Sequence, residues 1–381
     1  MFNITEINGI NQFLELRNEW NKVLEKSRDK NIFLTWEYLS TYWKHFGKRK
    51  KLRILCIEDK NEIIAIAPLR QSHYGFVGSL RARIGYDVIE PLGCRGLMPE
   101  GADYTGFMLA EREAECLQLL LNHLAEHCDW DFIYLIDVPE TSIIPDLLAK
   151  VSKTIPFAFK LENGAMCPYL SIPNSMDIFL KELSANFRYN LRRYMRKLEK
   201  NYHKVEFKKY EELGSVEEAM TIYFELHQKR WKSKHMPGVF NTQEVRDFYK
   251  DVAKLFADNG WLDLCFLTVN DEPIAGLYCF EYSQKIYGAL SGFDPDYSQY
   301  SVGNLLLAKV IENCIERRIK EFDFMKGGEL YKFGYSTKYR RNLEIRFINK
   351  RITSNLYSLG IRTLKKTKMD KILRRLTQAR S

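Results

Sequence analysis

One strand–turn–strand pattern occurs twice in this chain and restricts its fold more than any other feature. Residues 52–71, LRILCIEDKNEIIAIAPLRQ, place an apolar run, a polar turn at Asp59–Asn61 and a second apolar run in succession. Residues 262–282, LDLCFLTVNDEPIAGLYCFEY, repeat that design with a turn at Asn270–Glu272. Apolar runs of this length on either side of a short polar turn are typical of β-hairpins.

Each hairpin is followed later by an amphipathic helix pattern and a short apolar strand pattern. In the first half these are residues 113–128 and 130–138, and in the second half residues 304–318 and 321–325. We therefore predict an α/β protein with mixed sheets, built from two copies of one unit at about residues 1–165 and 166–350. The alternative is that two short hairpins resemble each other by chance.

The composition indicates an ordinary folded protein, because 45% of its 381 residues are hydrophobic and 28% are charged. No run of 18 apolar residues and no signal-peptide pattern occurs, so we expect a cytoplasmic protein. The cysteines contain no CxxC pair and are predicted to be reduced, buried thiols. They are Cys56, Cys94, Cys116, Cys128, Cys167, Cys265, Cys279 and Cys314.

The positive charge is concentrated at the C-terminal end. Residues 351–381 contain nine Lys or Arg against the single Asp370, which accounts for eight of the nine net charges. The remainder is close to neutral, so no basic coat for nucleic acid and no specific DNA binding are predicted. The tail pattern fits a basic amphipathic helix that lies on the inner face of an anionic membrane. A helix docked on the body, or a frayed end, is the alternative interpretation.

Residues 184–204, SANFRYNLRRYMRKLEKNYHK, predict a strongly basic helix. Its apolar positions fall on one stripe, and the six Arg and Lys residues between positions 188 and 200 are opposed only by Glu199. A solvated surface is one interpretation. Binding of an anionic group is the other, because arginine grips phosphate or carboxylate with two hydrogen bonds. Arg188 and Arg192 are the candidate substrate-binding residues on this helix.

A long polar junction leads from the predicted strand at 285–292 into the helix that begins near residue 302. Gly292–Ser301 exceeds the two to six residues that a bare connector needs. The N-terminus of a helix carries unpaired amide groups and a partial positive charge. The junction therefore predicts a cradle for an anion.

Four stretches resemble the GNAT-fold acyltransferases of the cellulose-biosynthesis-associated acetyltransferase-like family, which are relatives of the FemAB aminoacyltransferases. They are NFRYNLRRYMRKLEK, DEPIAGLYCF, LSGFDPDYSQYSVGNLLL and FDFMKGGELYKFGYS. The resemblance covers about residues 180–345 and reaches the first half through its hairpin and GADYTGFML. It implies tandem GNAT-like domains and acyl transfer to an amine or hydroxyl group.

In such enzymes the junction holds the pyrophosphate of an acyl coenzyme A through a Gln/Arg-x-x-Gly-x-Gly/Ala pattern. By this resemblance the cofactor-binding candidates are Gln299, Ser301, Val302, Gly303 and Asn304. Val302 and Asn304 stand where the family has small residues, and we expect the bulk of Val302 to keep phosphate away from the backbone. FemAB relatives also lack the pattern and take their acyl group from aminoacyl-tRNA.

Acyl transfer needs a base for the acceptor, donors for the oxyanion and an acid for the leaving thiolate. The resemblance makes Tyr331 the candidate general acid, with packing as the alternative. Asp294 and Glu329 are candidate bases, although Asp before Pro is also a common turn residue. Lys332 is a candidate for binding a phosphate or the oxyanion.

No metal site is predicted. His123 and His127 stand four residues apart in HLAEH, which is not the HExxH pattern of metal hydrolases. Neither a GxSxG elbow nor a Walker A loop occurs.

The predicted function is transfer of an acyl group, acetyl in the first instance, from acyl-CoA. The resemblance alone implies the acceptor, which is expected to be an amino or hydroxyl group of a saccharide or nucleotide-sugar precursor of the cell envelope. One alternative is a FemAB-type transferase that uses aminoacyl-tRNA to modify a peptidoglycan precursor. Another is a non-catalytic module that binds anionic glycolipid or tRNA.

Overall fold

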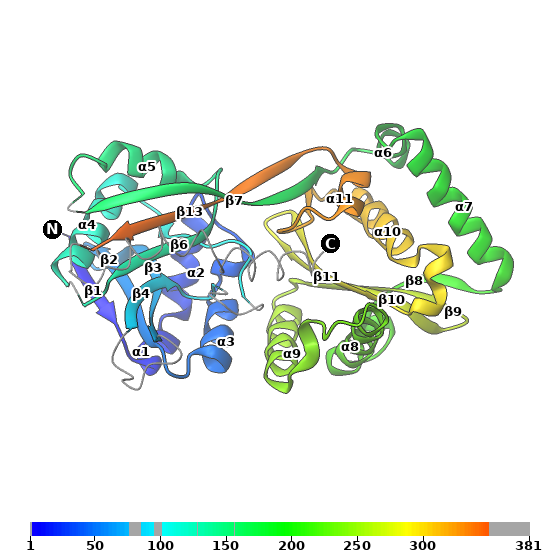
Figure 1. Cartoon of the computed structure of the whole chain (residues 1–381), viewed down its shortest axis with the longest axis horizontal. Helices are drawn as coiled ribbons and strands as arrows, with labels where there is room; N and C mark the ends of the chain where they lie inside the picture. The colour runs from blue at the N-terminus through cyan, green and yellow to red at the C-terminus, as the bar shows by residue number, and fades with distance from the viewer. Residues whose placement is uncertain (1, 76–84, 95–100, 128, 156, 350–381) are drawn as a thin grey trace. The chain divides into compact units, whose positions relative to one another are not determined.

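The computed structural model describes residues 2–75, 85–94, 101–127, 129–155 and 157–349 (Figure 1). Cys128 and the basic tail at 351–381 lie outside the described residues. The chain forms two units, one of residues 1–165 with the segment from Arg341 onward, and one of residues 166–340. The second unit thus ends before residue 350, because Asn342–Ile348 pair with a strand of the first unit.

Unit 1 is a mixed sheet with helices. Its strand order is β1-β2-β3-β4-β6-β13, in which only β4 and β6 run parallel, and β5 pairs with β3. The strands are β1 (Asn3–Ile7), β2 (Lys51–Asp59), β3 (Glu62–Gly75), β4 (Gly85–Pro91), β5 (Met108–Leu109), β6 (Phe132–Pro139) and β13 (Tyr339–Ile348). The helices are α1 (Ile10–Glu15), α2 (Arg17–Lys26), α3 (Trp36–Phe46), α4 (Glu113–Glu126) and α5 (Ile143–Val151).

Unit 2 repeats the design with the strand order β7-β12-β11-β10-β9-β8, in which only β11 and β12 run parallel. Its strands are β7 (Ala158–Ser171), β8 (Val205–Lys209), β9 (Leu262–Val269), β10 (Glu272–Tyr282), β11 (Lys285–Phe293) and β12 (Glu321–Asp323). Its helices are α6 (Met176–Glu182), α7 (Ala185–Asn201), α8 (Val216–Ser233), α9 (Gln243–Asp258), α10 (Val302–Glu316) and α11 (Leu330–Tyr335).

Both predicted hairpins form, as β2–β3 and β9–β10. The two turn residues have positive φ in each case, at 50° and 67° for Lys60 and Asn61 and at 49° and 70° for Asn270 and Asp271. Such two-residue turns match the right-handed twist of the flanking strands. In both units the hairpin is followed by a strand, a helix and a strand parallel to the previous one, so the predicted repeat and the α/β fold class are confirmed.

Helices cover both faces of the sheet in unit 2, with α8 and α9 on one side and α7 and α10 on the other (Figure 1). Alternate residues of β10 therefore face different helices. Tyr278 stacks on Tyr223 of α8 with 5.6 Å between ring centroids, whereas Leu277 and Cys279 pack in the cluster that contains α10. Burial on both faces explains why the β9 sequence is almost continuously apolar.

The basic helix predicted at 184–204 forms as α7, capped by the Ser184 side chain. Its apolar stripe packs as expected, since Leu191 and Leu198 are buried in the unit 2 core and Phe187, Tyr194 and Tyr202 pack against it.

Helix α8 crosses β11 at unusually short range. A Cβ atom added to Gly292 would lie 2.4 Å from the backbone nitrogen of His227 and 2.7 Å from its Cα. Next to this contact, the His227 ring is 1% exposed and its Nε2 accepts a hydrogen bond of 2.9 Å from the Trp231 indole. The Gly292 contact fixes α8, and with it the side chains of its last turns, against β11.

We predict that Gly292→Ala destabilises the protein by about 1–3 kcal/mol, the usual cost of overpacking. Backbone, not a flexible side chain, would have to move to admit the methyl group. Urea unfolding of purified variants measures the loss. Gly303→Ala is the control, because its Cβ would make only an ordinary 3.6 Å contact with the Phe293 ring. Equal stability of the two variants would contradict the close approach.

A second prediction concerns pH. Burial, and then the nearby Arg230 guanidinium, lower the pKa of His227 to about 3, so the ring stays neutral in the folded protein. The unfolded chain binds a proton near pH 6.5, so folding stability falls as pH drops below that value. Between pH 7.5 and pH 5 the wild type should lose about 2 kcal/mol through this group.

His227→Gln removes the titrating group while keeping an acceptor for Trp231. Urea unfolding at both pH values should show a smaller loss for this variant than for the wild type. Identical pH dependence in the two proteins would show that His227 is protonated in the folded state as easily as in the unfolded chain.

Candidate active site

Strands β11 and β12 separate soon after they meet. They pair only between Lys285–Tyr287 and Glu321–Asp323. Beyond Tyr287, β11 continues to Phe293 paired with β10 alone, and no described strand covers its other edge. The backbone groups of this edge are therefore open to an extended ligand, as at other unpaired strand edges.

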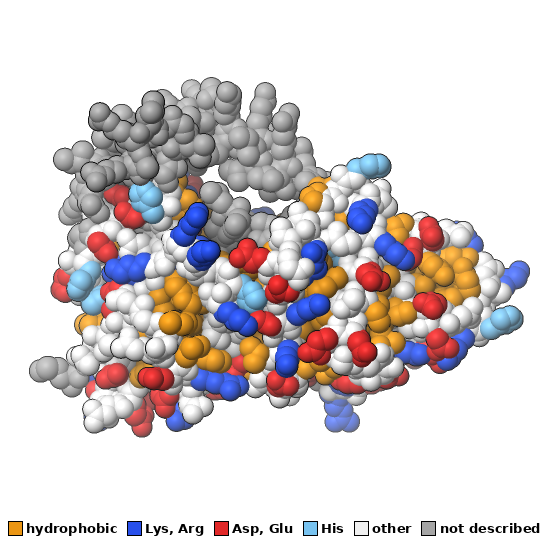
Figure 2. All heavy atoms as spheres, turned by 90° about the horizontal axis from the view of Figure 1, so that it is seen from below, with side chains coloured by type: hydrophobic (Ala, Val, Ile, Leu, Met, Phe, Trp, Pro, Cys, Tyr) orange, Lys and Arg blue, Asp and Glu red, His pale blue; other side chains and the backbone are white. Residues whose placement is uncertain are grey.

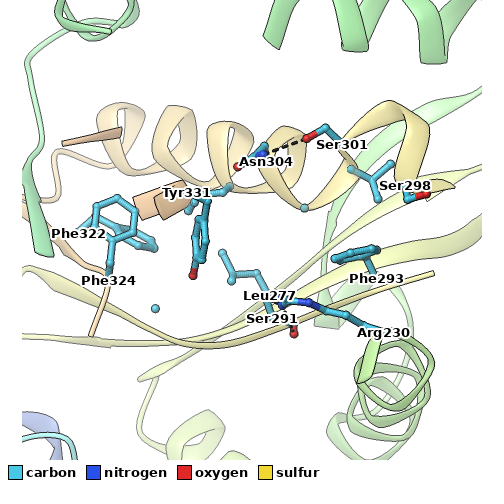
Figure 3. Close-up of a pocket in the computed structure, with 14 residues that line it drawn as sticks. Arg230, Leu277, Ser291, Phe293, Ser298, Ser301, Asn304, Phe322, Phe324 and Tyr331 are labelled. Atoms are coloured by element: carbon cyan, nitrogen blue, oxygen red, sulfur yellow. Dashed lines mark hydrogen bonds between the residues drawn. The ribbon is translucent and has the colours of Figure 1, made fainter. Parts of the chain in front are cut away.

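A pocket of about 220 Å³ occupies this opening (Figure 3). Its walls come from α8, β10, β11, η4 (Pro295–Tyr300), α10, β12 and α11. The lining is mostly apolar, with a few convergent polar groups, as ligand pockets usually are. It consists of Arg230, Leu277, Gly288, Ser291, Phe293, Ser298, Ser301, Val302, Gly303, Asn304, Leu307, Phe322, Phe324 and Tyr331.

The start of α10 leaves amide groups free at the pocket wall. Ser301 precedes the helix in a left-handed conformation, with φ 54°, and its hydroxyl accepts a 2.9 Å hydrogen bond from the Asn304 side chain. The amides of Asn304 and Leu305 both donate to the Ser301 carbonyl. Within the described residues, no acceptor is bound by the amides of Val302 and Gly303. These are the donors that a bound anion would use.

The side chains at the start of α10 are directed so that a ligand in the pocket can reach the backbone amides. The Val302 side chain is 1% exposed and packs in the core cluster, so its bulk is not in the way as the sequence suggested. Gly303 lines the pocket, and a Cβ there would extend toward the Phe293 ring at 3.6 Å. Ser301, Val302, Gly303 and Asn304, four of the candidates from the junction pattern, therefore line the pocket together. Gln299 does not line it and instead accepts a 3.1 Å hydrogen bond from Lys197.

The corresponding helix of unit 1, α4, begins with the same backbone geometry but with charged side chains. Its N-cap Arg112 has φ 47° and ψ 44°, close to the 54° and 42° of Ser301. Glu113 and Glu115 occupy the first turn of α4, whereas the first turn of α10 has no acidic residue. Glu113 and Glu115 form ion pairs with Arg28 and Arg112, so acidic side chains already lie beside the start of α4, and they disfavour a bound anion there.

Tyr331 reaches into the pocket from α11. Its side chain is 39% exposed, but Figure 3 shows the hydroxyl directed inward, past Leu277. Burial of this end, together with the nearby Glu329 carboxylate, raises the pKa of the Tyr331 phenol above its usual range. The phenol therefore keeps its proton at neutral pH and is a hydrogen-bond donor at the pocket.

Glu329 and Lys332 form contacts that stabilise the turn that carries Tyr331. Lys332 is 4% exposed, and its ammonium donates to the carbonyls of Met325, Lys326 and Gly327 at 3.2–3.3 Å. It also forms an ion pair of 2.8 Å with Glu329. Neither residue lines the pocket, and the Lys332 hydrogens are already occupied.

Asp294 is held outside the pocket. Its carboxylate accepts from Lys229 at 2.6 Å and from the amide of Asp296 at 3.1 Å, which caps η4. Burial opposes its ionisation, but these two donors outweigh burial and lower the pKa of Asp294. The geometry is that of a turn residue, the alternative noted from the Asp-Pro sequence.

The basic face of α7 is not part of the pocket lining. Arg188 donates a 2.7 Å hydrogen bond to the carbonyl of Leu180 and so ties α7 to the end of α6. Arg192 is exposed, and its carbonyl accepts from Arg196. Lys197 reaches the junction through Gln299 and lies 5.0 Å from the ring centroid of Tyr300.

Arg230 is the pocket residue that the sequence analysis missed. Its Nη1 donates to the carbonyl and the hydroxyl of Ser291, at 3.0 and 2.5 Å. The signal was present in α8, where Tyr223, Leu226 and His227 are buried and Arg230 falls on the same helical stripe. A cation at a core-facing position of a helix is unusual enough to indicate a site.

Among the described residues, no group of three or more His, Cys, Asp and Glu side chains is placed to hold a metal ion. The seven described cysteines are buried and carry no disulfide. Every helix in the described ranges is too short or too polar to cross a membrane. Figure 2 shows acidic and basic side chains interspersed on the face seen from below Figure 1.

Comparisons with known proteins show which family and which solved structures this chain is similar to. A family model described as an acetyltransferase (GNAT) domain matches residues 185–333, which contain the junction and Tyr331. No curated protein matches the chain.

Solved structures extend the similarity to both units. FemX has a TM-score of 0.63 and 12% identity, over 94% of this chain and 99% of that one. A conserved protein of unknown function from Bacteroides thetaiotaomicron has a TM-score of 0.54 and 13% identity, over 92% and 100%. The L-PGS structure from Bacillus licheniformis gives 0.52 and 10%, over 92% and 97%. Residues 185–333 thus match the model of a GNAT acetyltransferase domain, and the whole chain has a fold similar to that of FemX.

Proposed function

We propose that unit 2 transfers an acyl group from acyl-CoA to an amine or hydroxyl acceptor. The observation that carries this proposal is the pair of free amides at Val302 and Gly303, next to the open edge of β11. The amides fit the pyrophosphate of coenzyme A, and the strand edge fits the amide-bearing arm that links the pyrophosphate to the sulfur. The apolar pocket wall fits the acyl group.

Tyr331 is the proposed general acid. The acceptor nitrogen or oxygen bonds to the acyl carbon, the carbon–sulfur bond breaks, and the phenol gives its proton to the sulfur. The phenol recovers a proton as the acceptor loses one, so charge and protons balance over the cycle. Neither Asp294 nor Glu329 lines the pocket, so no carboxylate is assigned as the base.

The acceptor expected from the family resemblance is a saccharide or nucleotide-sugar precursor of the cell envelope, with an acetyl group as the acyl moiety. It remains part of the proposal, together with peripheral contact of residues 351–381 with an anionic membrane. The resemblance supports the first, and the charge pattern of the tail supports the second.

A second candidate function is transfer from aminoacyl-tRNA, as in the FemAB relatives. The observation that favours it is the exposed basic face of α7. Its cations make no ion pair with any described residue, which leaves them available for a polyanion. They are Arg192, Arg193, Arg196, Lys197 and Lys200.

We predict that Gly303→Asp weakens acetyl-CoA binding about tenfold or more, because a carboxylate in the first turn of α10 would repel an anion bound at its amides. An acidic residue stabilises the first turn of a helix, so the variant should stay folded. Calorimetric titration with acetyl-CoA measures the affinity, and Gly303→Ala serves as the uncharged control.

Two results together would favour the second function over the first. The wild-type protein would bind uncharged tRNA but not acetyl-CoA, and tRNA binding would be lost when Arg193 and Arg196 are changed to Gln. Equal acetyl-CoA affinity of wild type and Gly303→Asp would remove the cradle from the proposal.

We also predict that Tyr331→Phe lowers kcat by about 10²–10⁴-fold with little change in acetyl-CoA affinity, since only the transferable proton is removed. Release of free thiol from acetyl-CoA in the presence of amine acceptors measures turnover. Tyr189→Phe, an exposed tyrosine on α7, is the matched control. A normal rate for Tyr331→Phe would make the tyrosine a packing residue.

A further inference from the structure

Arg230 is a cation without a counter-charge in the pocket wall. Within the described residues it forms no ion pair, and its Nε is buried without a hydrogen-bond partner. Its two bonds from Nη1 to Ser291 fix the guanidinium but do not neutralise it. A partly buried charge is costly unless an anion accompanies it, so the arrangement favours an anionic ligand.

The side chain is held in one position before any ligand binds. The guanidinium lies 5.2 Å from the ring centroid of Phe293 and is anchored to Ser291. The contact of α8 with Gly292 fixes the helix that carries it. Preorganised guanidinium groups bind carboxylate and phosphate oxygens through parallel N–H groups with little further loss of entropy.

Phe293 separates this cation from the amide cradle. A Cβ on Gly303 would approach the Phe293 ring at 3.6 Å, and Figure 3 shows the ring between α10 and Arg230. The amides of α10 and the guanidinium of α8 therefore address different parts of the pocket. Tyr331 lines the same pocket as Arg230 and the amides of α10.

We infer that Arg230 binds an oxyanion of the acceptor, so that the acceptor carries a carboxylate or a phosphate in addition to the amine or hydroxyl that is acylated. This inference rests on the proposed acyl transfer and narrows its substrate class. The guanidinium positions the acceptor on the α8 side of the opening, and the acyl donor lies along β11 and α10. Uncharged acceptors of the same size are disfavoured, since they leave Arg230 unpaired.

The test measures anion binding with the amide cradle blocked. Gly303→Asp protein serves as the background, and inorganic phosphate, acetate and the neutral acetamide are titrated by NMR of the protein. We expect phosphate or acetate to bind and acetamide not to bind. Arg230→Gln in the same background should weaken anion binding about 10- to 100-fold, the usual range for charge-assisted hydrogen bonds. Lys232→Gln, an exposed lysine on the same helix, should leave it unchanged.

The relative affinity of phosphate and acetate identifies which oxyanion the acceptor carries. Equal anion affinity of the Arg230→Gln and parent proteins, or equal binding of acetamide and acetate, overturns the inference. Acetyl-CoA titration of Arg230→Gln on the otherwise native chain provides the second readout, and we expect unchanged affinity. A loss there of tenfold or more would assign Arg230 to the donor instead.

These readouts separate the two proposals. Failure of wild-type protein to bind acetyl-CoA contradicts the proposed function, whatever the anion titrations give. Normal acetyl-CoA binding with no effect of Arg230→Gln on anions contradicts only the acceptor assignment.

Discussion

Strands β11 and β12 hold together for only three residues, and the chemistry of unit 2 depends on where they part. While they are paired, they close the sheet between β10 and β7. After Tyr287 and Asp323 they diverge, and the sheet has an opening in its interior rather than at its rim. Helices cover both faces there, so the opening is lined by side chains from above and below and becomes a pocket instead of a hole.

The two units show that this backbone plan alone does not make a site. In both units a helix connects two parallel strands, and the N-cap residue of that helix has a left-handed backbone conformation. In unit 1 that helix begins with glutamates, and Arg112 pairs with Glu115 and lies 3.7 Å from Asp59. In unit 2 the first turn of the helix is formed by Val302, Gly303 and Asn304 and contains no acidic residue. The two helix starts therefore share a backbone geometry and differ in their side-chain charges.

The sequence predicted the parts of this architecture that depend on local patterns. The hairpins, the basic amphipathic helix and the junction before α10 follow from residue periodicity and turn chemistry, which act over a few positions. It did not predict that residues 341–348 belong to unit 1, because strand pairing between β13 and β6 joins residues some 200 positions apart. The orientation of Val302 was also out of reach, since which side of a helix start faces the core depends on the whole packing arrangement.

The candidate site residues also fall into two groups, those that line the pocket and those that do not. Ser301, Val302, Gly303, Asn304 and Tyr331 line one pocket because they stand at the ends of elements whose order was predicted correctly, whereas Gln299 does not line it. Asp294, Glu329 and Lys332 are nearby in sequence, but they serve turns, since each finds partners in its own loop before it can reach the pocket. Arg230 was missed because a lone arginine in a polar stretch of sequence resembles any solvated charge until the helix face is known.

The hydrogen bonds of Lys332 matter for an enzyme that binds an acyl thioester, as proposed for this protein. A protein that holds a reactive thioester next to its own lysine risks acylating itself, because an amine lone pair attacks the acyl carbon as readily as a substrate does. Lys332 follows Tyr331 directly in the chain, yet its nitrogen is turned away from the pocket and its hydrogens are shared among three carbonyls and a carboxylate. The Lys332 nitrogen is thus held by its own turn and does not line the pocket. Under the proposed function, this arrangement keeps the amine next to Tyr331 in the chain away from the thioester.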